Sequence, residues 1–207
     1  MTVTILDYGV GNLGSVRNAL KFLGIEPVIT ADRDVIAATT VLVVPGQGAA
    51  GDAMAALRSQ SLVPVVQDYI RSGRPYLGIC LGFQLLFDVT EEDGGTQGLG
   101  IFGGQVKRFD SAVVKVPQMG WNQLDVVNDP LNLTVGLDQP LNGYFANSYY
   151  ALPDDPSIVF TTTEYGVRFA SSIQTSTVLG CQFHPEKSGP VGLHIMKEFL
   201  NRHAYSY

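Results

Sequence analysis

The chain has 207 residues, of which 45% are hydrophobic and 15% are charged, the composition of a globular protein that buries a sizeable core. We expect a single domain over residues 1–207. The formal net charge of −6 argues against nucleic acid or an anionic membrane as a main partner. The sequence has no apolar run near the roughly 20 residues of a membrane span, no apparent signal peptide, and too few cysteines for a disulfide framework. We therefore expect a cytoplasmic protein.

The first part of the chain alternates predicted strands with predicted helices. Apolar runs predict strands at 3–6, 27–30, 41–44 and 75–80. Apolar residues at helical spacing predict helices from Leu13 to Leu23 and from Leu62 to Ile70, with Gly24 and Gly73 at their ends. The strand at 41–44 has no polar alternation, which is typical of a strand buried on both faces. This alternation predicts a parallel sheet covered by helices on both sides.

The character of the sequence changes after residue 87. A Gly-rich polar stretch at 91–104 is predicted to be a loop. Segments rich in Val, Thr, Tyr and Phe then predict strands at 105–109, 113–116, 121–127, 144–150, 158–163, 167–173 and 178–183. A last helix is predicted at about 190–203, with Pro190 in its first turn. We expect an α/β fold with a mixed, mainly parallel sheet, to which the second half adds antiparallel strands.

Gly78-Ile79-Cys80-Leu81-Gly82 has the Gly-x-Cys-x-Gly spacing of a nucleophile elbow, with sulfur in place of a serine hydroxyl. Glycines flank such a nucleophile because the strand-to-helix turn is crowded. The apolar run at 83–87 suits the start of a buried helix, whose dipole and free N–H groups favour the Cys80 thiolate. The N–H of Leu81 is a candidate oxyanion donor. The alternative is a buried structural cysteine.

A candidate base lies in the segment His184-Pro185-Glu186, directly after a predicted strand. Pro185 favours an extended conformation at His184, and residues two apart in an extended segment face the same way. We therefore expect Glu186 to orient His184, giving a nucleophile, a general base and its orienter. A strand-end histidine beside an exposed glutamate is the alternative. Cys181 is expected to be a core residue.

The turn Pro45-Gly46-Gln47-Gly48 follows the buried strand at 41–44. In a parallel sheet it would emerge at the same edge as Cys80. Its N–H groups, especially that of Gln47, are candidates for a second oxyanion donor. A plain tight turn is the alternative.

A competing motif lies near the N-terminus. Residues 9–14 read Gly-Val-Gly-Asn-Leu-Gly after a predicted strand, and Asp32 follows about 20 residues later. This is the pattern of a dinucleotide-binding loop. The pattern is short, however, and glycine is common in tight strand-to-helix turns for steric reasons. We therefore rank this interpretation below the cysteine site.

Together the Pro-Gly-x-Gly turn, the cysteine elbow and His184-Pro-Glu186 resemble the class I, triad-type glutamine amidotransferases in order and spacing. The resemblance covers nearly the whole chain. It implies a flavodoxin-like sandwich fold and glutamine hydrolysis through a Cys80 thioester, with Cys80, His184 and Glu186 as the triad. It also implies that Gly46, Gly48, Gln84, Ser148 and Tyr149 hold the substrate. No metal or cofactor is implied.

Further motifs narrow the resemblance. They are Asp7-Tyr-Gly-Val-Gly-Asn-Leu13, Pro117-Gln-Met-Gly-Trp-Asn122, Tyr144-Phe-Ala-Asn-Ser-Tyr149 and Gln182-Phe-His-Pro-Glu-Lys-Ser188. These are similar to the glutaminase subunits of imidazole glycerol phosphate synthase, an enzyme of histidine biosynthesis. This implies a heterodimer with a (β/α)8-barrel cyclase that receives the ammonia, with Asn12, Trp121, Tyr144 and Lys187 as candidate contacts. In this group the loop at 9–14 faces the partner and holds no dinucleotide.

One position departs from the family pattern. Asn147 stands where these subunits usually carry a histidine, which leaves the triad intact but makes local contacts less certain. A glutaminase subunit of another pathway, such as anthranilate or pyridoxal phosphate synthesis, is the main rival interpretation. A non-catalytic scaffold is a second rival, and the intact triad argues against it. A DJ-1-like or peptidase-like cysteine hydrolase fits less well, because its acid and base are arranged differently.

Overall fold

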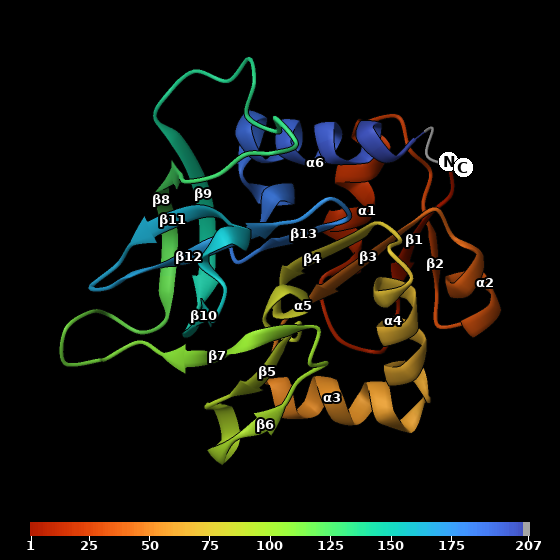
Figure 1. Cartoon of the computed structure of the whole chain (residues 1–207), viewed down its shortest axis with the longest axis horizontal. Coiled ribbons are helices and arrows are strands. Elements are labelled where there is room, and N and C mark those ends of the chain that lie inside the picture. Colours follow the sequence, from red (N-terminus) through yellow and green to blue (C-terminus); the bar gives the residue numbers. More distant parts are fainter. Residues whose placement is uncertain (205–207) are drawn as a thin grey trace.

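The computed structural model describes residues 1–204, and within them 13 strands join in one sheet (Figure 1). Five neighbouring strands are parallel. In spatial order they are β2 (Val28–Thr30), β1 (Val3–Leu6), β3 (Val41–Gly46), β4 (Tyr76–Cys80) and β13 (Val178–Cys181). The last of these comes from the far end of the sequence, and it pairs with β4 so that Cys181 lies opposite Ile79. The residues after β13 therefore emerge beside Cys80.

Helices cover both faces of this parallel region (Figure 1). One face packs against α1 (Leu13–Phe22) and α6 (Gly189–His203). The other packs against α2 (Arg33–Ala38), α3 (Ala50–Ser59) and α4 (Leu62–Arg71). Along β3, Val41 and Val43 join the first core whereas Leu42 and Val44 join the second, as the two-residue period of a strand requires. The unbroken apolar run of β3 is explained by these two cores.

The second half extends the sheet with mostly antiparallel pairs. From β13 the order continues with β12 (Arg168–Gln174), β10 (Tyr149–Pro153), β7 (Phe102–Arg108), β5 (Phe87–Thr90) and β6 (Thr96–Gln97). A branch leaves β12 through β11 (Val159–Glu164), β8 (Gln118–Val126) and β9 (Leu141–Asn147). Within this extension, β5 and β7 are parallel. The expected mixed sheet with added antiparallel strands is confirmed.

Several predicted elements differ from the structure around residue 87. The helix after Cys80, α5 (Leu81–Gln84), is a single turn, and Phe87 already begins β5. The chain returns at residues 98–102, where Leu99 N–H donates to the Leu85 carbonyl and Ile101 N–H donates to the Leu86 carbonyl. Those bonds favour an extended path over further helix. The predicted loop at 91–104 likewise contains a 3-10 turn (η1, Glu92–Gly94), β6 and the start of β7.

Other differences have local causes. The predicted strand at 113–116 is a turn, because the Asp110 carbonyl accepts from the N–H groups of Val113 and Val114. The predicted strand at 144–150 is divided into β9 and β10 at Ser148. Helices α2 and α3 were not predicted. The two remaining 3-10 turns are η2 (Pro156–Ile158) and η3 (Pro185–Lys187).

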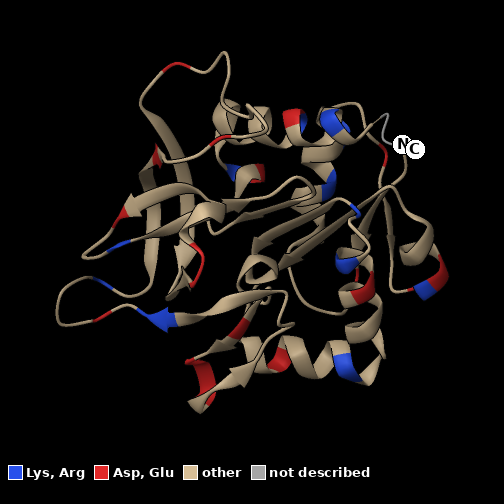
Figure 2. Cartoon of the chain, in the orientation of Figure 1, with Lys and Arg blue, Asp and Glu red and all other residues tan. Residues whose placement is uncertain are grey.

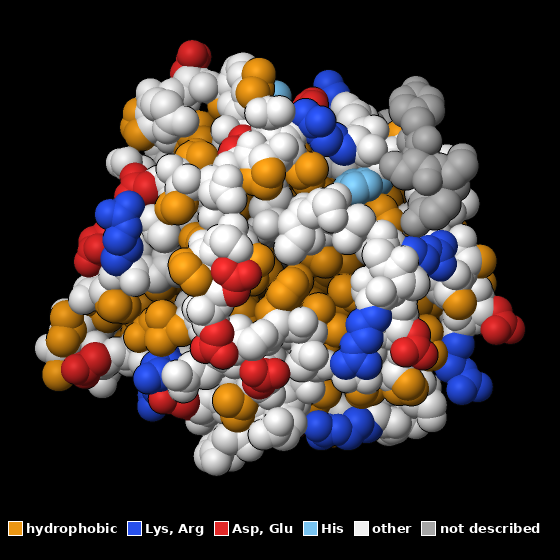
Figure 3. Space-filling view, viewed as in Figure 1, with side chains coloured by type: hydrophobic (Ala, Val, Ile, Leu, Met, Phe, Trp, Pro, Cys, Tyr) orange, Lys and Arg blue, Asp and Glu red, His pale blue; other side chains and the backbone are white. Residues whose placement is uncertain are grey.

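Charged residues are dispersed along the ribbon, and Lys and Arg do not gather on one element within residues 1–204 (Figure 2). The face in Figure 3 carries acidic and basic side chains interspersed with apolar ones. In the same part of the chain, each helix is too short or too polar to cross a bilayer.

Candidate active site

Cys80 lies at the tip of a sharp turn between β4 and α5. Its backbone has φ 54° and ψ −104°, a region that residues other than glycine rarely adopt. A Cβ on Gly82 would lie 1.8 Å from the Val44 carbonyl oxygen, and one on Gly78 would lie 2.7 Å from the Gly82 carbonyl oxygen. Both flanking positions are therefore restricted to glycine by close backbone contact, as the elbow motif predicts.

His184 and Glu186 form a buried pair next to this turn. His184 Nδ1 and Glu186 Oε1 are 2.9 Å apart, and their side chains are only 7% and 2% exposed. The expected geometry was partly wrong, because an extended segment does not continue through both residues. His184 is extended, but Pro185 begins the 3-10 turn η3, and the carboxylate reaches the imidazole across that turn.

The backbone of His184 is held from two directions. Its N–H donates to the Tyr144 carbonyl at 2.8 Å, which ties it to β9. The Ser188 hydroxyl donates to the His184 carbonyl at 2.7 Å and accepts from the Tyr144 N–H at 2.9 Å. These contacts fix the imidazole relative to the elbow, since β9 and β4 belong to the same sheet.

The environment of His184 favours its protonated form. Burial lowers its pKa, but hydrogen bonds with Cys80 and Glu186, together with the negative charge of both groups, outweigh burial and raise the pKa to about 9. Since Nδ1 faces Glu186, the hydrogen bond with Cys80 falls to Nε2. An imidazolium beside sulfur stabilises a thiolate.

We expect Cys80→Ala to lower the pKa of His184, because the sulfur contributes a hydrogen bond and a charge that both raise it. The measurement is an NMR titration of His184 in both proteins. The raised pKa also has a stability consequence: the contribution of protonated His184 is full below pH 6.5 and is lost as the pH rises through about 9. An unchanged His184 titration in the alanine variant would contradict the pairing with Cys80.

A cavity of about 230 Å³ opens over Cys80 and His184. Eleven further residues line it: Gln47, Gly48, Leu81, Gln84, Glu92, Pro117, Ala146, Asn147, Ser148, Tyr149 and Lys187. Most of the predicted oxyanion and substrate residues are therefore at one place. Gly46, by contrast, is not among the residues that line the cavity. A Cβ at Gly46 would lie 2.7 Å from both Leu81 Cβ and the Tyr8 hydroxyl, so this glycine is needed for close packing.

The predicted partner contacts occupy different positions. Lys187 lines the cavity itself. Trp121 is 56% exposed and lies opposite Tyr144 in the β8–β9 ladder, with ring centroids 6.0 Å apart. Asn12 caps α1, where its side chain accepts from the Ser15 N–H at 3.2 Å.

Glu92 was not predicted as a site residue, because it lies in the stretch at 91–104 that was predicted to be a loop. Its carboxylate accepts from the Ala50 N–H at 2.6 Å and lines the cavity. Burial raises the pKa of Glu92, the Ala50 hydrogen bond lowers it, and the charges of Asp93 and Asp52 raise it, with a net increase. This carboxylate is an acidic group in the wall of the cavity that Cys80 and His184 also line.

Two other side chains near the site had no predicted role. Asn147, the departure from the family pattern, donates to the Tyr149 carbonyl at 2.9 Å. Gln182 is fully buried, and its Nε2 lies 3.7 Å from the Cys80 sulfur. Cys181 is also fully buried, and burial raises the pKa of its thiol, in keeping with a core residue.

The glycine-rich loop at 9–14 is explained by packing. A Cβ on Gly11 would lie 3.3 Å from Gly46 Cα, so this loop packs directly against the end of β3. Asp32 does not face it as a ribose ligand would. Its carboxylate caps α2 by accepting from the N–H groups of Asp34 and Val35 at 2.9 and 3.2 Å.

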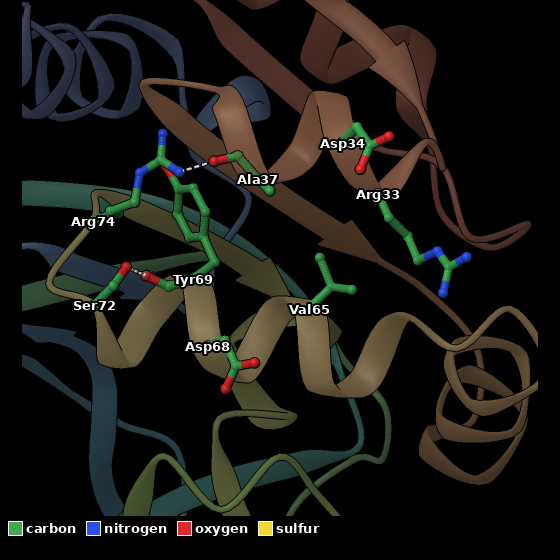
Figure 4. A pocket seen from close by; sticks show the side chains of 8 residues that line it. All are labelled: Arg33, Asp34, Ala37, Val65, Asp68, Tyr69, Ser72 and Arg74. Atoms are coloured by element: carbon green, nitrogen blue, oxygen red, sulfur yellow. Dashed lines mark hydrogen bonds between the residues drawn. The ribbon is translucent and has the colours of Figure 1, made fainter.

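A larger cavity of about 470 Å³ lies elsewhere, between α2 and α4 (Figure 4). Arg74 borders it, donates to the carbonyls of Ala37 and Thr39, and stacks on the Tyr69 ring at 4.6 Å. These contacts join two helices. The lining contains neither cysteine nor histidine, so we assign the chemistry to the smaller cavity. Among residues 1–204, three or more His, Cys, Asp or Glu side chains do not converge as they would around a metal ion.

The chain is similar to known proteins over nearly its whole length. The family model described as glutamine amidotransferase class-I matches residues 4–202. A solved glutamine amidotransferase superposes with a TM-score of 0.74 at 21% identity, covering 99% of this chain and all of the other. A chain of PurLQS from Thermotoga maritima gives 0.75 at 19% identity, covering 97% of each chain. These two likenesses concern the fold.

The chain therefore belongs to the class I glutamine amidotransferase family. Within that family, it groups with the subunits called imidazole glycerol phosphate synthase subunit HisH. It is 46% identical over 204 residues to the subunit of Moorella thermoacetica, covering 98% of this chain and 96% of the relative. It is 44% identical over 198 residues to that of Rhodopirellula baltica, covering 95% and 96%.

Proposed function

We propose that this chain is the glutaminase subunit of an imidazole glycerol phosphate synthase in histidine biosynthesis. It hydrolyses L-glutamine to glutamate and ammonia and passes the ammonia to a cyclase subunit. The observation that carries the proposal is the buried His184–Glu186 pair beside Cys80, which lies on a nucleophile elbow under a polar cavity. The similarity to HisH subunits over nearly the whole chain supports the pathway.

The chemistry proceeds in two halves. The Cys80 thiolate attacks the side-chain amide carbon of glutamine, and the N–H groups of Leu81 and the Gln47–Gly48 turn stabilise the oxyanion. The C–N bond breaks as His184 gives its proton to the leaving ammonia, which leaves a γ-glutamyl thioester. His184 then takes a proton from water, the resulting hydroxide attacks the thioester, and glutamate leaves with the thiolate regenerated.

Substrate binding uses other residues that line the same cavity. Gln84, Ser148 and Tyr149 line it and offer polar groups to the amino-acid end of glutamine. We assign the Glu92 carboxylate to the α-ammonium group, since it is the acidic side chain among the lining residues. Its hydrogen bond from Ala50 N–H fixes its position before the substrate arrives.

Glu92→Gln should raise KM for glutamine by about 10- to 100-fold, because a hydrogen bond to a charged group is lost, while kcat changes much less. Steady-state kinetics of glutamate formation measure both constants. The matched control is Glu91→Gln, whose exposed carboxylate accepts from the Arg108 N–H instead and should leave KM unchanged. A fall in kcat without a change in KM would contradict the assignment.

The partner of this subunit is a (β/α)8-barrel cyclase, bound as a heterodimer. The cyclase joins ammonia to a phosphorylated ribulosyl aminoimidazole carboxamide nucleotide, giving imidazole glycerol phosphate and the carboxamide ribotide. Free ammonia becomes ammonium in water and loses its nucleophilicity, so direct transfer is chemically useful. Exposed Trp121 and Met119 on β8 offer apolar contact for this partner. The cytoplasm is the location that goes with this role.

The proposal is tested with purified chain, alone and mixed with a barrel cyclase subunit and its nucleotide ligand. We expect co-elution in size-exclusion chromatography and a strong rise in glutamine hydrolysis in the complex. Cys80→Ala is the control: its complex should form product with added ammonium but not with glutamine. Hydrolysis that is indifferent to the cyclase would reject this partner and favour another amidotransferase pathway.

A further inference from the structure

Gln182 is a buried carboxamide that the reaction scheme above does not use. It follows β13 directly, its N–H donates to the Ser171 carbonyl at 2.9 Å, and its side chain is fully buried. It lies outside the set of residues that line the cavity. Its Nε2 nevertheless lies 3.7 Å from the sulfur of Cys80, a distance at which an amide N–H can donate to sulfur. It approaches the nucleophile from the protein interior.

The orientation of this carboxamide follows from its neighbours. The Tyr149 carbonyl can only accept, and it accepts from Gln84 Nε2 at 3.0 Å. The same nitrogen has a second N–H, which donates to Gln182 Oε1 at 2.9 Å. With its oxygen held by Gln84, Gln182 must present its nitrogen to the sulfur. A backbone carbonyl thus sets the direction of both side chains.

Asn147 strengthens this anchor. Its Nδ2 also donates to the Tyr149 carbonyl, at 2.9 Å, so both lone pairs of that oxygen are used. Gln84 is 9% exposed and lines the cavity, whereas Gln182 does not reach it. The chain of contacts therefore runs from the substrate cavity through Gln84 and Gln182 to the back of the nucleophile.

We propose that Gln182 is a further catalytic residue, whose carboxamide stabilises the Cys80 thiolate and joins it through Gln84 to the amino-acid end of bound glutamine. The inference rests on the proposed glutaminase activity. A thiolate accepts hydrogen bonds more strongly than a thiol, so an N–H directed at the sulfur favours the reactive form. Both N–H groups of Gln84 are used within the protein, so a ligand that donates a hydrogen bond to Gln84 Oε1 polarises the same chain of contacts.

Gln182→Met tests the donor with little change in side-chain volume. The readout is the rate of Cys80 alkylation by iodoacetamide as a function of pH, in the full chain without glutamine. We expect the midpoint pH of alkylation to rise by about one unit, a tenfold change in the thiolate equilibrium, and kcat to fall about tenfold with KM little changed. An unchanged midpoint together with an unchanged kcat would overturn the proposal.

The titratable groups beside the sulfur are His184 and Tyr8, and Glu186 acts through His184. Glu92 and Lys187 line the same cavity. The Gln182→Met substitution leaves all five residues unchanged. The matched control is Gln174→Met, because Gln174 is a buried carboxamide in β12 that contacts Asp129. Its alkylation midpoint should stay at the wild-type value. Cys80→Ala identifies any alkylation at Cys181.

A second variant covers the case in which Gln182→Met does not fold. Gln84→Met removes the N–H that holds the Gln182 oxygen, so the carboxamide of Gln182 is free to rotate. We expect the alkylation midpoint to rise, by less than in Gln182→Met. No rise would count against the relay. Alkylation needs no substrate, so it tests the role of Gln182 independently of the proposed function. A chain that does not hydrolyse glutamine under any condition would refute the proposed function. The pH dependence of alkylation would still show whether Gln182 stabilises the Cys80 thiolate.

Discussion

Replacing Cys80 with alanine should lower glutamine hydrolysis by about 10⁴-fold or more, because the covalent route is lost. The fold should remain. The sulfur contacts the His184 imidazole, the Ala146 carbonyl at 4.0 Å and Gln182 Nε2 at 3.7 Å, whereas the elbow itself is held by close backbone packing at Gly78 and Gly82. Ammonia release and circular dichroism of the purified variant measure the two expectations separately.

The matched control is Cys181→Ala. Cys181 is fully buried in β13, and burial raises the pKa of its thiol, so it lacks the reactive environment of Cys80. We expect this variant to lose about 1–2 kcal/mol of stability, as for a small core truncation, and to keep its activity. If Cys181→Ala lost activity while Cys80→Ala retained it, the nucleophile would have been assigned to the wrong strand.

The second large effect concerns stability. Gly82→Ala should reduce the free energy of unfolding by about 4 kcal/mol or more, or prevent folding. Its Cβ would lie 1.8 Å from the Val44 carbonyl oxygen and 2.8 Å from the Val44 carbonyl carbon, both backbone atoms of a central strand. Relief requires that α5 move away from β3, which also displaces Cys80. Urea unfolding monitored by fluorescence gives the free energy.

Gly14→Ala provides the comparison. This glycine lies in the first turn of α1, and the nearest atom to its Cβ is Asn12 Oδ1 at an ordinary 3.7 Å. Alanine favours helix over glycine, so we expect a gain of up to about 1 kcal/mol. Equal effects at the two positions would show that close packing at Gly82 is not the reason for its glycine.

The parts of the site that could be predicted from the sequence are those that depend on a few neighbouring residues. The elbow needs glycines at fixed distances from Cys80, so its pattern occupies five residues of sequence, although the closest contact of Gly82 is with Val44 in the neighbouring strand. The proximity of His184 and Glu186 was also predicted, although the 3-10 turn that creates it was not. Both features have short sequence signatures, so both could be predicted without knowing the fold.

The missing parts depend on contacts between distant segments. Nothing near residue 178 indicates that β13 pairs in parallel with β4, yet that pairing brings His184 and Gln182 to Cys80. Helix α3 buries Ala50, Ala53, Met54 and Leu57, a helical spacing whose alanines give a weak hydrophobic signal. α5 is shorter than expected because the strand pairing that follows it is a tertiary effect.

The most direct test of the central claim is the mass of the peptide containing Cys80, isolated after acid quench during glutamine turnover by the complex with the cyclase. His184→Asn should slow both the formation and the hydrolysis of the thioester, because the same imidazole protonates the leaving ammonia and activates water. We predict one γ-glutamyl group on Cys80 and none on Cys181. Ammonia release with Cys80 unmodified at every quench time, in both proteins, would contradict the thioester mechanism proposed for this chain.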